Sequence, residues 1–329
     1  MADLQQTEPG PGLLQVACRL AGQCFWVAVT LSAWQQQAYG LFAVGALLGG
    51  LWFASFMSLT HDAVHHTLTG IPVLDEVLAR MVSWPMTWPI GVYAHAHALH
   101  HKLNGVDPRD PERVQPTEEE YARASPVKRW FMRHQLEFRI FVAGAFGLVS
   151  SLLLGALSRA RTTPALRRVL LLDALGIALT TTTIYGTAYL VGGSDLVVGV
   201  LLQWLIYERC VGVAHQFRVH AEHYGRWQSR GNFLDTQYAA TRNIESNALL
   251  RLFYNHLNRH AVHHMFARIP FYRLEEANRR LGDLYAQAGN VTHDSSGYLE
   301  VWHEMRDAQA RRNFIRVSAM PALSKSPEE

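Results

Sequence analysis

A long uncharged run near the start of the chain constrains the fold more than any other feature of the sequence. No Asp, Glu, Lys or Arg occurs between Arg19 and Asp62, and two shorter uncharged runs follow at 140–158 and 174–194. A helix needs about 20 predominantly apolar residues to cross the hydrocarbon core of a bilayer. The sequence therefore predicts an integral membrane protein, although its mean hydropathy of -0.02 is that of a soluble domain.

The composition excludes several classes of protein and of metal site. A chain that is 49% hydrophobic and 17% charged is too apolar to be disordered. Cys18, Cys24 and Cys210 are too few for a disulfide-rich secreted module, and they form no CxxC pair for a rubredoxin-like or iron–sulfur centre. The net charge of +3, without aromatics interleaved among basic runs, argues against nucleic-acid binding. Any metal must be held by other side chains.

Histidine is concentrated in three short stretches. Of the 17 histidines, 11 lie within 61–66, 95–101 and 256–264. Residues three and four apart share a face of a helix, so each stretch presents imidazoles that converge. One such pair is as easily explained by ordinary polar packing, but three clusters beside the same membrane face indicate metal binding.

The pattern of ligands distinguishes between metals. A zinc protease needs HExxH, whereas His303-Glu304 is followed by Asp307 at the position of the second histidine. Soluble di-iron carboxylate proteins need two Glu-x-x-His motifs, and only Glu300 with His303 has this spacing. Eight or more imidazoles exceed what one zinc or copper ion needs, and imidazole suits iron. The count fits two ions with open positions for dioxygen.

The three clusters resemble the histidine boxes of the membrane fatty acid desaturase family, whose members are membrane di-iron enzymes. His61, Asp62 and His65 match the first box, and His97, His100 and His101 match the second. The family's third box reads N-x-H-x-x-H-H before a Phe/Pro stretch, and an R-x-x-x-E-H pattern precedes it. These patterns match Asn258, His260, His263, His264, Phe266 and Pro270, and the segment from Arg218 to His223.

The resemblance extends from about Gly40 to Leu274, and it implies nine metal ligands. They are His61, His65, His97, His100, His101, His223, His260, His263 and His264. Neighbouring groups are candidates to accept the free imidazole N–H and so orient the ligands. These candidates are Asp62, Asp107, Asp110, Glu222 and Asn258, with His66 as a further neighbour outside the ligand set.

Two of these assignments have an equally good alternative, because Asp107 and Asp110 would also suit caps in a loop. His66 directly follows a ligand and projects about 100° round the helix from it. The remaining histidines are expected to bind no metal: His95, His220 and His256 as hydrogen-bonding neighbours, and His134, His215, His293 and His303 as ordinary surface or interfacial residues.

The apolar stretches predict the crossings of the membrane. Residues 13–34 and 38–60 form a first hairpin, turned at the polar Gln35-Gln36-Gln37. The histidine clusters precede and follow the later apolar stretches, so an even number of these must span if the clusters share one face. Those stretches are 140–158, 169–191 and 196–213.

A basic link decides between the possible pairings. Arg159, Arg161, Arg167 and Arg168 lie between the first two later stretches, and the positive-inside rule places them in the cytoplasm. We therefore expect a second hairpin from the last two stretches. The stretch at 140–158 is then a membrane-embedded helix that does not cross.

The expected fold is a single all-α integral membrane domain over 1–329. Four transmembrane helices and the embedded helix would carry a cytoplasmic helical cap with the di-iron site. Residues 1–12 have no basic side chain, which is the wrong flank for a signal peptide. The expected order is a polar N-terminal tail (1–12), the first hairpin (13–60), histidine boxes one and two (61–138), the embedded helix and basic link (139–168), the second hairpin (169–213) and a cytoplasmic region with box three (214–329).

The resemblance implies an enzyme that uses two Fe²⁺ ions and O2 to introduce a double bond into an acyl chain of a lipid or thioester. The chain has no cytochrome b5 His-Pro-Gly-Gly motif and no cysteine ligand set. A separate ferredoxin, rubredoxin, flavodoxin or cytochrome b5, with its reductase, would supply the electrons. Trp84, Trp88 and Tyr93 are candidates to line an acyl tunnel, or simply pack at the membrane interface. The site would face the cytoplasm, from a bacterial inner membrane or the endoplasmic reticulum.

Two other functions stay open. A di-iron hydroxylase or ketolase of an alkyl or isoprenoid lipid would use the same site, and the sequence does not separate these outcomes. A non-enzymatic His-rich metal-binding membrane protein would place ionisable groups within its spans. Nearly all histidines here lie at or beyond the predicted span ends, which disfavours that alternative.

Overall fold

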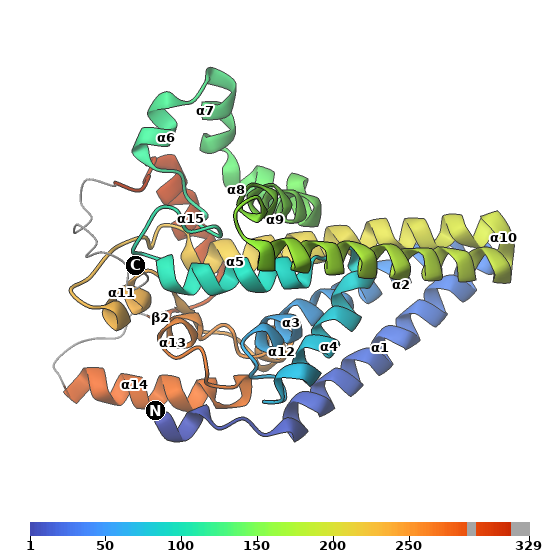
Figure 1. The fold of residues 1–329 in the computed structure, drawn as a ribbon, viewed down its shortest axis with the longest axis horizontal. Helices are drawn as coiled ribbons and strands as arrows, with labels where there is room; N and C mark the ends of the chain where they lie inside the picture. The colour runs from blue at the N-terminus through green and yellow to red at the C-terminus, as the bar shows by residue number, and fades with distance from the viewer. Residues whose placement is uncertain (288–293, 317–329) are drawn as a thin grey trace.

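The computed structural model describes residues 1–287 and 294–316, and these are predominantly helical. Long helices extend from one end of the molecule, and the shorter helices gather at the other end (Figure 1). The long helices are α1 (Pro9–Gln35), α2 (Tyr39–Ala54) and α10 (Pro164–His223). The all-α membrane fold expected from the sequence is confirmed in this arrangement.

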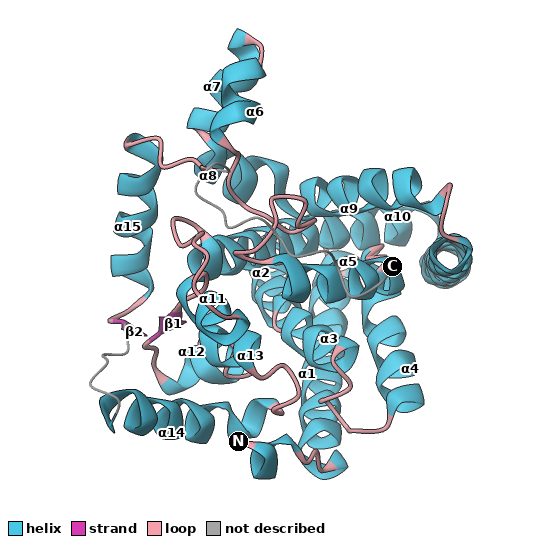
Figure 2. Ribbon diagram, turned by 60° about the vertical axis from the view of Figure 1, so that its left-hand side comes forward, coloured by secondary structure: helices cyan, strands magenta, loops and turns pink. Residues whose placement is uncertain are grey.

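The shorter elements follow in chain order. Figure 2 shows the one pair of strands among the described residues, β1 (Asn243–Ile244) and β2 (Asp294–Ser295), which pair in parallel. The helices that build the compact end are α3 (Phe56–Val64), α4 (Pro72–Ser83), η2 (Trp84–Met86), α5 (Ile90–Leu103), α6 (Glu118–Arg123), α7 (Pro126–Arg133), α11 (Phe233–Ala239), α12 (Ala248–Phe253), α13 (His260–Met265), η4 (Phe271–Arg273), α14 (Leu274–Gln287) and α15 (Tyr298–Ala310).

Helix α10 is two arms joined by a reversal. Gly192 and Gly193 leave helical geometry, and Gly193 has φ +64°, a conformation that glycine adopts without steric cost. Figure 1 shows the two arms running back alongside each other. They contain both stretches of the predicted second hairpin. The second arm continues as helix past residue 213, and this extension carries His223 into the compact end.

Within 1–287 and 294–316, four helical segments are long and apolar enough to cross a membrane: Pro9–Gln35, Tyr39–Val64, Gln135–Ala160 and the two-armed Pro164–His223. The third contains α8 (Gln135–Glu137), the π-helical turn η3 (Phe138–Ala143) and α9 (Gly144–Ala160). Figure 1 shows α9 end-on while α1, α2 and α10 lie across the page. This orientation is the one expected of an embedded helix that does not cross the membrane. Length and composition alone do not distinguish such a helix from one that crosses.

A charged pair on α10 stabilises the break before α9. Gly144 has φ +56°, and a Cβ there would collide with the guanidinium of Arg209. Arg209 donates to the carbonyl of Val142 (2.7 Å), and Glu208 accepts from the backbone N–H of Phe146 (2.9 Å). The two charges therefore satisfy backbone groups that the helix break exposes, which explains their presence in an otherwise apolar segment.

The N-terminal residues pack against the third-box region. The segment predicted as a polar tail contains a short helix, η1 (Ala2–Gln5), and α1 already begins at Pro9. Leu4 is buried in a core cluster with Leu257 and Val262. Arg273 and Arg280 form ion pairs with Glu8 and Asp3. The start of the chain is thus part of the compact end.

Candidate metal centre

The nine histidines that the sequence singled out converge at the compact end. They come from α3 and the residue after it, from α5, from the last turn of α10 and from α13. His61, His65, His97, His101 and His263 form one set, in which each offers a ring nitrogen within 4.8 Å of the others. We call this set the five-histidine group.

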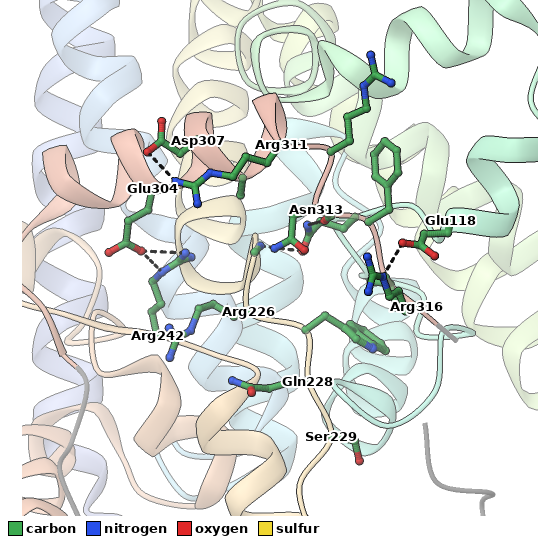
Figure 3. Close-up of a pocket in the computed structure, with 17 residues that line it drawn as sticks. Glu118, Arg226, Gln228, Ser229, Arg242, Glu304, Asp307, Arg311, Asn313 and Arg316 are labelled. Atoms are coloured by element: carbon green, nitrogen blue, oxygen red, sulfur yellow. Dashed lines mark hydrogen bonds and ion pairs between the residues drawn. The ribbon is translucent and has the colours of Figure 1, made fainter. Parts of the chain in front are cut away.

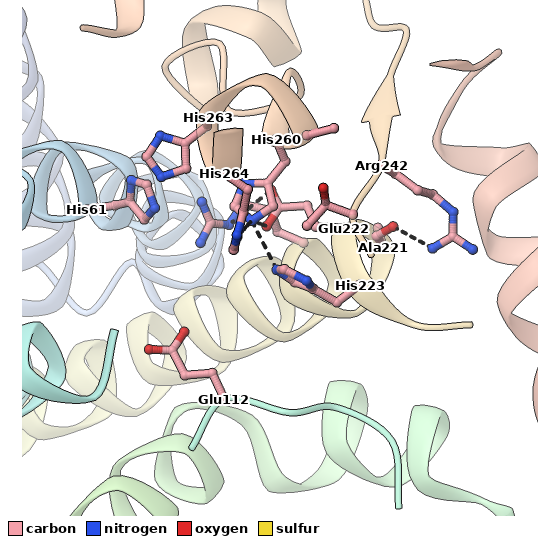
Figure 4. A network of polar contacts seen from close by, with 12 residues as sticks. His61, Glu112, Ala221, Glu222, His223, Arg242, His260, His263 and His264 are labelled. Atoms are coloured by element: carbon pink, nitrogen blue, oxygen red, sulfur yellow. Dashed lines mark hydrogen bonds and ion pairs between the residues drawn. The ribbon is translucent and has the colours of Figure 1, made fainter. Parts of the chain in front are cut away.

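The other four histidines form a second set beside the first. His100, His223 and His264 offer ring nitrogens within 4.8 Å of one another, and His223 and His260 do so together with Glu222. We call His100, His223, His260 and His264 the four-histidine group. Figure 4 shows members of both groups with Glu222 and Glu112.

Each HxxHH box is divided between the two groups. In the second box, His97 and His101 belong to the five-histidine group and His100 belongs to the four-histidine group. At about 100° per residue, His101 projects about 40° from His97 on one side, whereas His100 projects about 60° from His97 on the other side. One helical turn therefore contributes side chains to both groups, and α13 repeats the arrangement, with His263 in the five-histidine group and His260 and His264 in the four-histidine group.

The donor atoms face one another at contact distance. The Nε2 of His97 lies 3.1 Å from the Nε2 atoms of both His61 and His65. In the other group, the Nε2 of His260 lies 3.0 Å from that of His223 and 3.1 Å from that of His264. Imidazole nitrogens gathered without intervening side chains are a donor set that fits a transition-metal ion in each group.

Acidic and amide side chains hold the outer nitrogens of three of these rings. The Nδ1 of His97 lies 3.1 Å from both carboxylate oxygens of Glu112, and the Nδ1 of His100 lies 2.9 Å from Asp110. The Nδ1 of His264 lies 3.0 Å from the Oε1 of Gln237. An Nδ1–H that donates outward leaves Nε2 bare on the inner side, as a metal ligand requires.

The orientation of Gln237 is itself fixed, because its Nε2 donates to the carbonyl of Asn104 (2.9 Å). The oxygen of the amide must then face His264. The sequence analysis missed both Gln237 and Glu112. They lie outside the family motifs, and only the fold brings them to the ring nitrogens.

The predicted neighbours of the ligands differ in what they contact. Asp62 lies 3.5 Å from the Nδ1 of His61, Glu222 lies 3.4 Å from the Nε2 of His260, and Asp110 contacts His100 as described. Asp62 and Asp110 face Nδ1 atoms, where a group that orients a ligand is expected. Glu222 instead faces the inner nitrogen of His260 and could itself offer an oxygen to a metal.

Asp107, Asn258 and His66 are the other predicted neighbours. Among the described residues, none of them forms a hydrogen bond or ion pair with a histidine of the two groups. Asp107 instead accepts from the backbone N–H and the guanidinium of Arg109, which is the loop-capping alternative. Asn258 donates to the carbonyl of Ile244 and so fixes β1. His66 is exposed, with φ +55°, where the chain leaves α3.

A buried arginine on the first long helix reaches the five-histidine group through two intermediates. Arg19 is only 4% exposed, and it donates to the carbonyls of Ser55 and Leu252 and to the Oδ1 of Asn255 (2.6 Å). Asn255 in turn donates to Asp62 (2.8 Å), the carboxylate beside His61. The sequence analysis used Arg19 only as the edge of an apolar run.

A buried aspartate on α10 supports the helix that carries the second box. Asp173 accepts from the backbone N–H groups of Gly91 (2.9 Å) and Val92 (3.1 Å) and from the indole N–H of Trp84 (3.1 Å). A carboxylate at the first turn of a helix satisfies free N–H groups and interacts favourably with the helix dipole. Asp173 thereby fixes the start of α5.

The electrostatics of the centre keep most rings outside the spans neutral. Burial, reinforced by the neighbouring imidazoles, holds the pKa of His97, His101 and His263 well below 6.5. The same causes lower the pKa of His260 and His264. Neutral imidazole is the form that binds a metal.

His100 is the exception. Burial lowers its pKa, but the carboxylate of Asp110 more than offsets this and raises the pKa to about 9. His100 is therefore protonated at neutral pH in the metal-free protein.

The remaining described histidines stay outside the two groups. His220 donates to the carbonyl of Gln216 (2.7 Å), and His256 lies 3.6 Å from Glu275. His215, expected to be a surface or interfacial residue, is instead buried and packs edge-on against Trp88. His134 and His303 are exposed and His95 is partly buried. His293 lies outside the described residues.

A cavity of about 520 Å³ is lined by none of the nine histidines but by two residues that contact His97, Tyr93 and Glu112. Leu148 and Leu152 of α9 line one part of it, and Tyr93 and Glu112 line another. The ring of Tyr93 stacks on His97 with centroids 5.0 Å apart. The cavity thus extends from the apolar embedded helix to the outer side of a histidine in the centre.

A larger cleft, of about 850 Å³, lies elsewhere (Figure 3). Its charged residues pair mostly with one another: Arg242 with Glu304, Arg311 with Asp307 and Arg316 with Glu118. Its lining contains none of the nine histidines and, unlike the smaller cavity, neither Tyr93 nor Glu112. Size alone therefore does not locate the chemistry in this molecule.

Comparison with known proteins agrees with the geometry. A family model described as fatty acid desaturase matches residues 38–296, which is most of the chain and includes all nine histidines. A search of curated proteins gave no match. The chain belongs to the fatty acid desaturase family, an integral membrane family of oxidoreductases.

Proposed function

We propose that the protein is an O2-dependent di-iron desaturase that introduces a double bond into an acyl chain of a lipid or thioester. The observation that carries this proposal is the division of the nine histidines into two adjacent groups of bare ring nitrogens. A single metal would not need two such groups. Membership of the desaturase family supports the oxidative chemistry.

In this proposal each group holds one Fe²⁺ ion. The ligands are His61, His65, His97, His101 and His263 for one ion, and His100, His223, His260 and His264 for the other. When bound, the two ions would supply the activation of dioxygen that the oxidation of an unactivated alkyl chain requires.

The chain's own residues prepare the site for this chemistry. Glu112, Asp110 and Gln237 hold Nδ1–H groups outward and so aim the Nε2 atoms inward. Burial of the centre keeps bulk water from the reacting atoms, since His61, His97 and His260 are each at most 3% exposed.

The cavity beside Tyr93 supports an acyl substrate. Its apolar part lies on the embedded helix α9, where a lipid chain can enter, and its inner part meets His97 through Tyr93. Trp88 lines the same cavity, as the acyl-tunnel hypothesis expected. Trp84 instead donates to Asp173 and packs against Gly176, so its role is structural.

The electrons come from a separate donor with its reductase in this proposal, and ferredoxin, rubredoxin, flavodoxin or cytochrome b5 would each serve. In this proposal the site faces the cytoplasm, because a basic segment at the junction of α9 and α10 contains Arg159, Arg161, Arg167 and Arg168. A bacterial inner membrane or the endoplasmic reticulum satisfies this orientation.

Oxygen-18 labelling tests the reaction. Purified protein with an electron donor, its reductase and a panel of acyl substrates is turned over under ¹⁸O2, and the products are analysed by mass spectrometry. A desaturase sends both oxygen atoms to water and leaves an unlabelled alkene. Label in the main organic product would replace the desaturase assignment with a hydroxylase or ketolase, and turnover without O2 would contradict both.

A further inference from the structure

A second cavity, of about 570 Å³, lies where α9 crosses the first arm of α10. Its lining is almost entirely apolar, with Leu153 and Leu157 from α9 and Leu170, Leu171 and Ile177 from α10. Leu157 and Leu171 are more than half exposed on helices that the fold places in or against the membrane. The cavity is therefore an apolar groove that opens toward lipid.

Two arginines lie at one end of this groove. Arg161 follows the last turn of α9 and Arg167 lies in the first turn of α10. Both are exposed, and neither forms an ion pair among the described residues. The one carboxylate in the lining, Asp173, already accepts from Trp84 and from the start of α5. The positive charge of the two arginines is therefore not neutralised within the groove.

We propose that this groove binds an anionic phospholipid. One acyl chain would lie along the leucines, and the phosphate would lie between the guanidinium groups of Arg161 and Arg167. Two features select this occupant: unpaired guanidinium groups bind phosphate oxygens strongly, and basic residues at the membrane surface attract anionic lipids. A zwitterionic lipid would fill the groove but would neutralise less of the positive charge of Arg161 and Arg167.

The groove also adjoins the support of the metal centre. Asp173 lies in its lining, and the same carboxylate fixes the N-terminus of α5, the helix with three of the nine histidines. A bound acyl chain would exclude water from these hydrogen bonds. The lipid site is thus a place where the composition of the membrane acts on the stability of α5.

The test uses the full-length protein in phosphatidylcholine nanodiscs with a trace of phosphatidylglycerol that carries a photoreactive group on its acyl chain. After irradiation, the cross-linked peptides are identified by mass spectrometry. We expect label in 153–177, and we expect unlabelled phosphatidylglycerol to compete much better than phosphatidylcholine. Label elsewhere only, or equal competition by both lipids, would overturn the proposal. Competition by inorganic phosphate at millimolar concentration would also overturn it, since it would show a site for free phosphate rather than lipid.

Two variants and a matched control sharpen the result. An arginine at the membrane surface contributes about 1 kcal/mol to binding of anionic lipid, so the double variant Arg161→Gln/Arg167→Gln is expected to lose about 25-fold in competition by phosphatidylglycerol. Arg168→Gln removes a charge from the same basic segment but not from the groove lining, and it is expected to change competition by no more than about fivefold. Equal losses in the double variant and in the control would overturn the site.

The second variant, Ala174→Phe, fills the groove from an exposed position and avoids the core. We expect it to abolish cross-linking while the metal content stays unchanged. Persistent cross-linking at 153–177 in this variant would contradict the placement of the acyl chain.

Discussion

The two histidine groups are built from different parts of the molecule. The five-histidine group takes His61 and His65 from the end of a long apolar helix, and a chain of buried hydrogen bonds from Arg19 supports them. The four-histidine group takes its ligands from α5, α13 and the last turn of α10. Both groups therefore take a ligand from the end of a long apolar helix, and the five-histidine group is in addition supported by side-chain hydrogen bonds that start from α1.

The groups also share a supporting loop. Asp110 holds a ring of the four-histidine group, and two residues later Glu112 holds a ring of the five-histidine group. Because α5 supplies ligands to both groups and this loop follows it, a disturbance of α5 affects both positions. A disturbance of Arg19 reaches only one of them directly.

The largest expected effect comes from removing the ligands of one group at a time. His61→Ala/His65→Ala and His260→Ala/His264→Ala should each lower the iron content from about two per chain to about one, since each group holds its own ion. Both should reduce desaturation to background. Metal analysis of the purified variants, beside an activity assay, measures the effect.

His134→Ala is the control, because His134 is exposed and lies in neither group. It should keep both iron and activity. If either double variant lost all its iron while remaining folded by circular dichroism, the two groups would not be independent metal positions.

A smaller effect is expected from the residues that hold the outer nitrogens. Glu112→Gln and Asp110→Asn each weaken one support, and such changes typically cost about 10- to 100-fold in metal affinity. The loss should fall on the five-histidine group for Glu112 and on the four-histidine group for Asp110. Co²⁺ titrations followed by visible absorption, in the background of each double-alanine variant, resolve the two groups. Equal losses at both groups would show that the loop acts as one unit.

The sequence identified the histidines that converge much better than the side chains that contact them. Helical spacing and the family motifs were enough for the nine histidines, because each motif is local in the chain. The division of each HxxHH box was not predicted, since it depends on which neighbouring helix faces each side of α5. Glu112, Gln237 and Arg19 carry no local signal, and only the packing of distant segments reveals their roles.

The fold shows the same difference between local and distant information. Uncharged runs were enough to predict the long helices, and the Gly192-Gly193 reversal fits the short link expected there. The polar tail was read from composition alone, and that reading missed the packing of Leu4 against box three. Asp107 and Asn258 were assigned by closeness in sequence to the ligands, but each has a nearer backbone or side-chain partner.

The two groups should also differ in their response to pH. The carboxylate of Asp110 raises the pKa of His100 to about 9, against the lowering effect of burial. A metal must therefore displace a proton from His100 at neutral pH. Burial and the neighbouring imidazoles hold the pKa values of His97, His101 and His263 well below 6.5, so these rings are already neutral. Between pH 6.5 and about 9, Co²⁺ affinity should rise about tenfold per pH unit at the four-histidine group and stay nearly flat at the five-histidine group.

Below pH 6.5 the stability of the fold should also increase with rising pH. The unfolded chain then takes up protons that the lowered rings in the metal-free protein do not, so the free energy of unfolding should fall with falling pH. Replacing Asp110 with Asn removes the group that raises the pKa of His100, and the pH dependence of the four-histidine group should flatten. Identical slopes for the two groups in the unmodified protein would contradict the assignment of the extra proton to His100.

The smallest expected effect comes from Arg19, which acts on the metal through two other side chains. Arg19→Met keeps much of the apolar volume but leaves Asn255 and two carbonyls without their donor. Such unsatisfied buried groups cost about 1–3 kcal/mol each in unfolding free energy, less where water reaches them. Metal affinity should fall severalfold at the five-histidine group, because Asn255, which donates to Asp62, then loses the donor that orients it. It should stay unchanged at the four-histidine group.

Asp173→Asn provides the contrast for Arg19. It weakens the support at the N-terminus of α5, whose histidines serve both groups, so it should lower metal affinity at both.

Asn255 has φ +49°, a conformation that needs support from its surroundings, and Asn255→Gly relieves the backbone while removing the side chain. If the Arg19 chain positions His61, Asn255→Gly should reproduce the selective loss seen in Arg19→Met, although the backbone is less strained. A loss at both groups in Arg19→Met would instead show that the arginine supports the whole compact end and not one metal position.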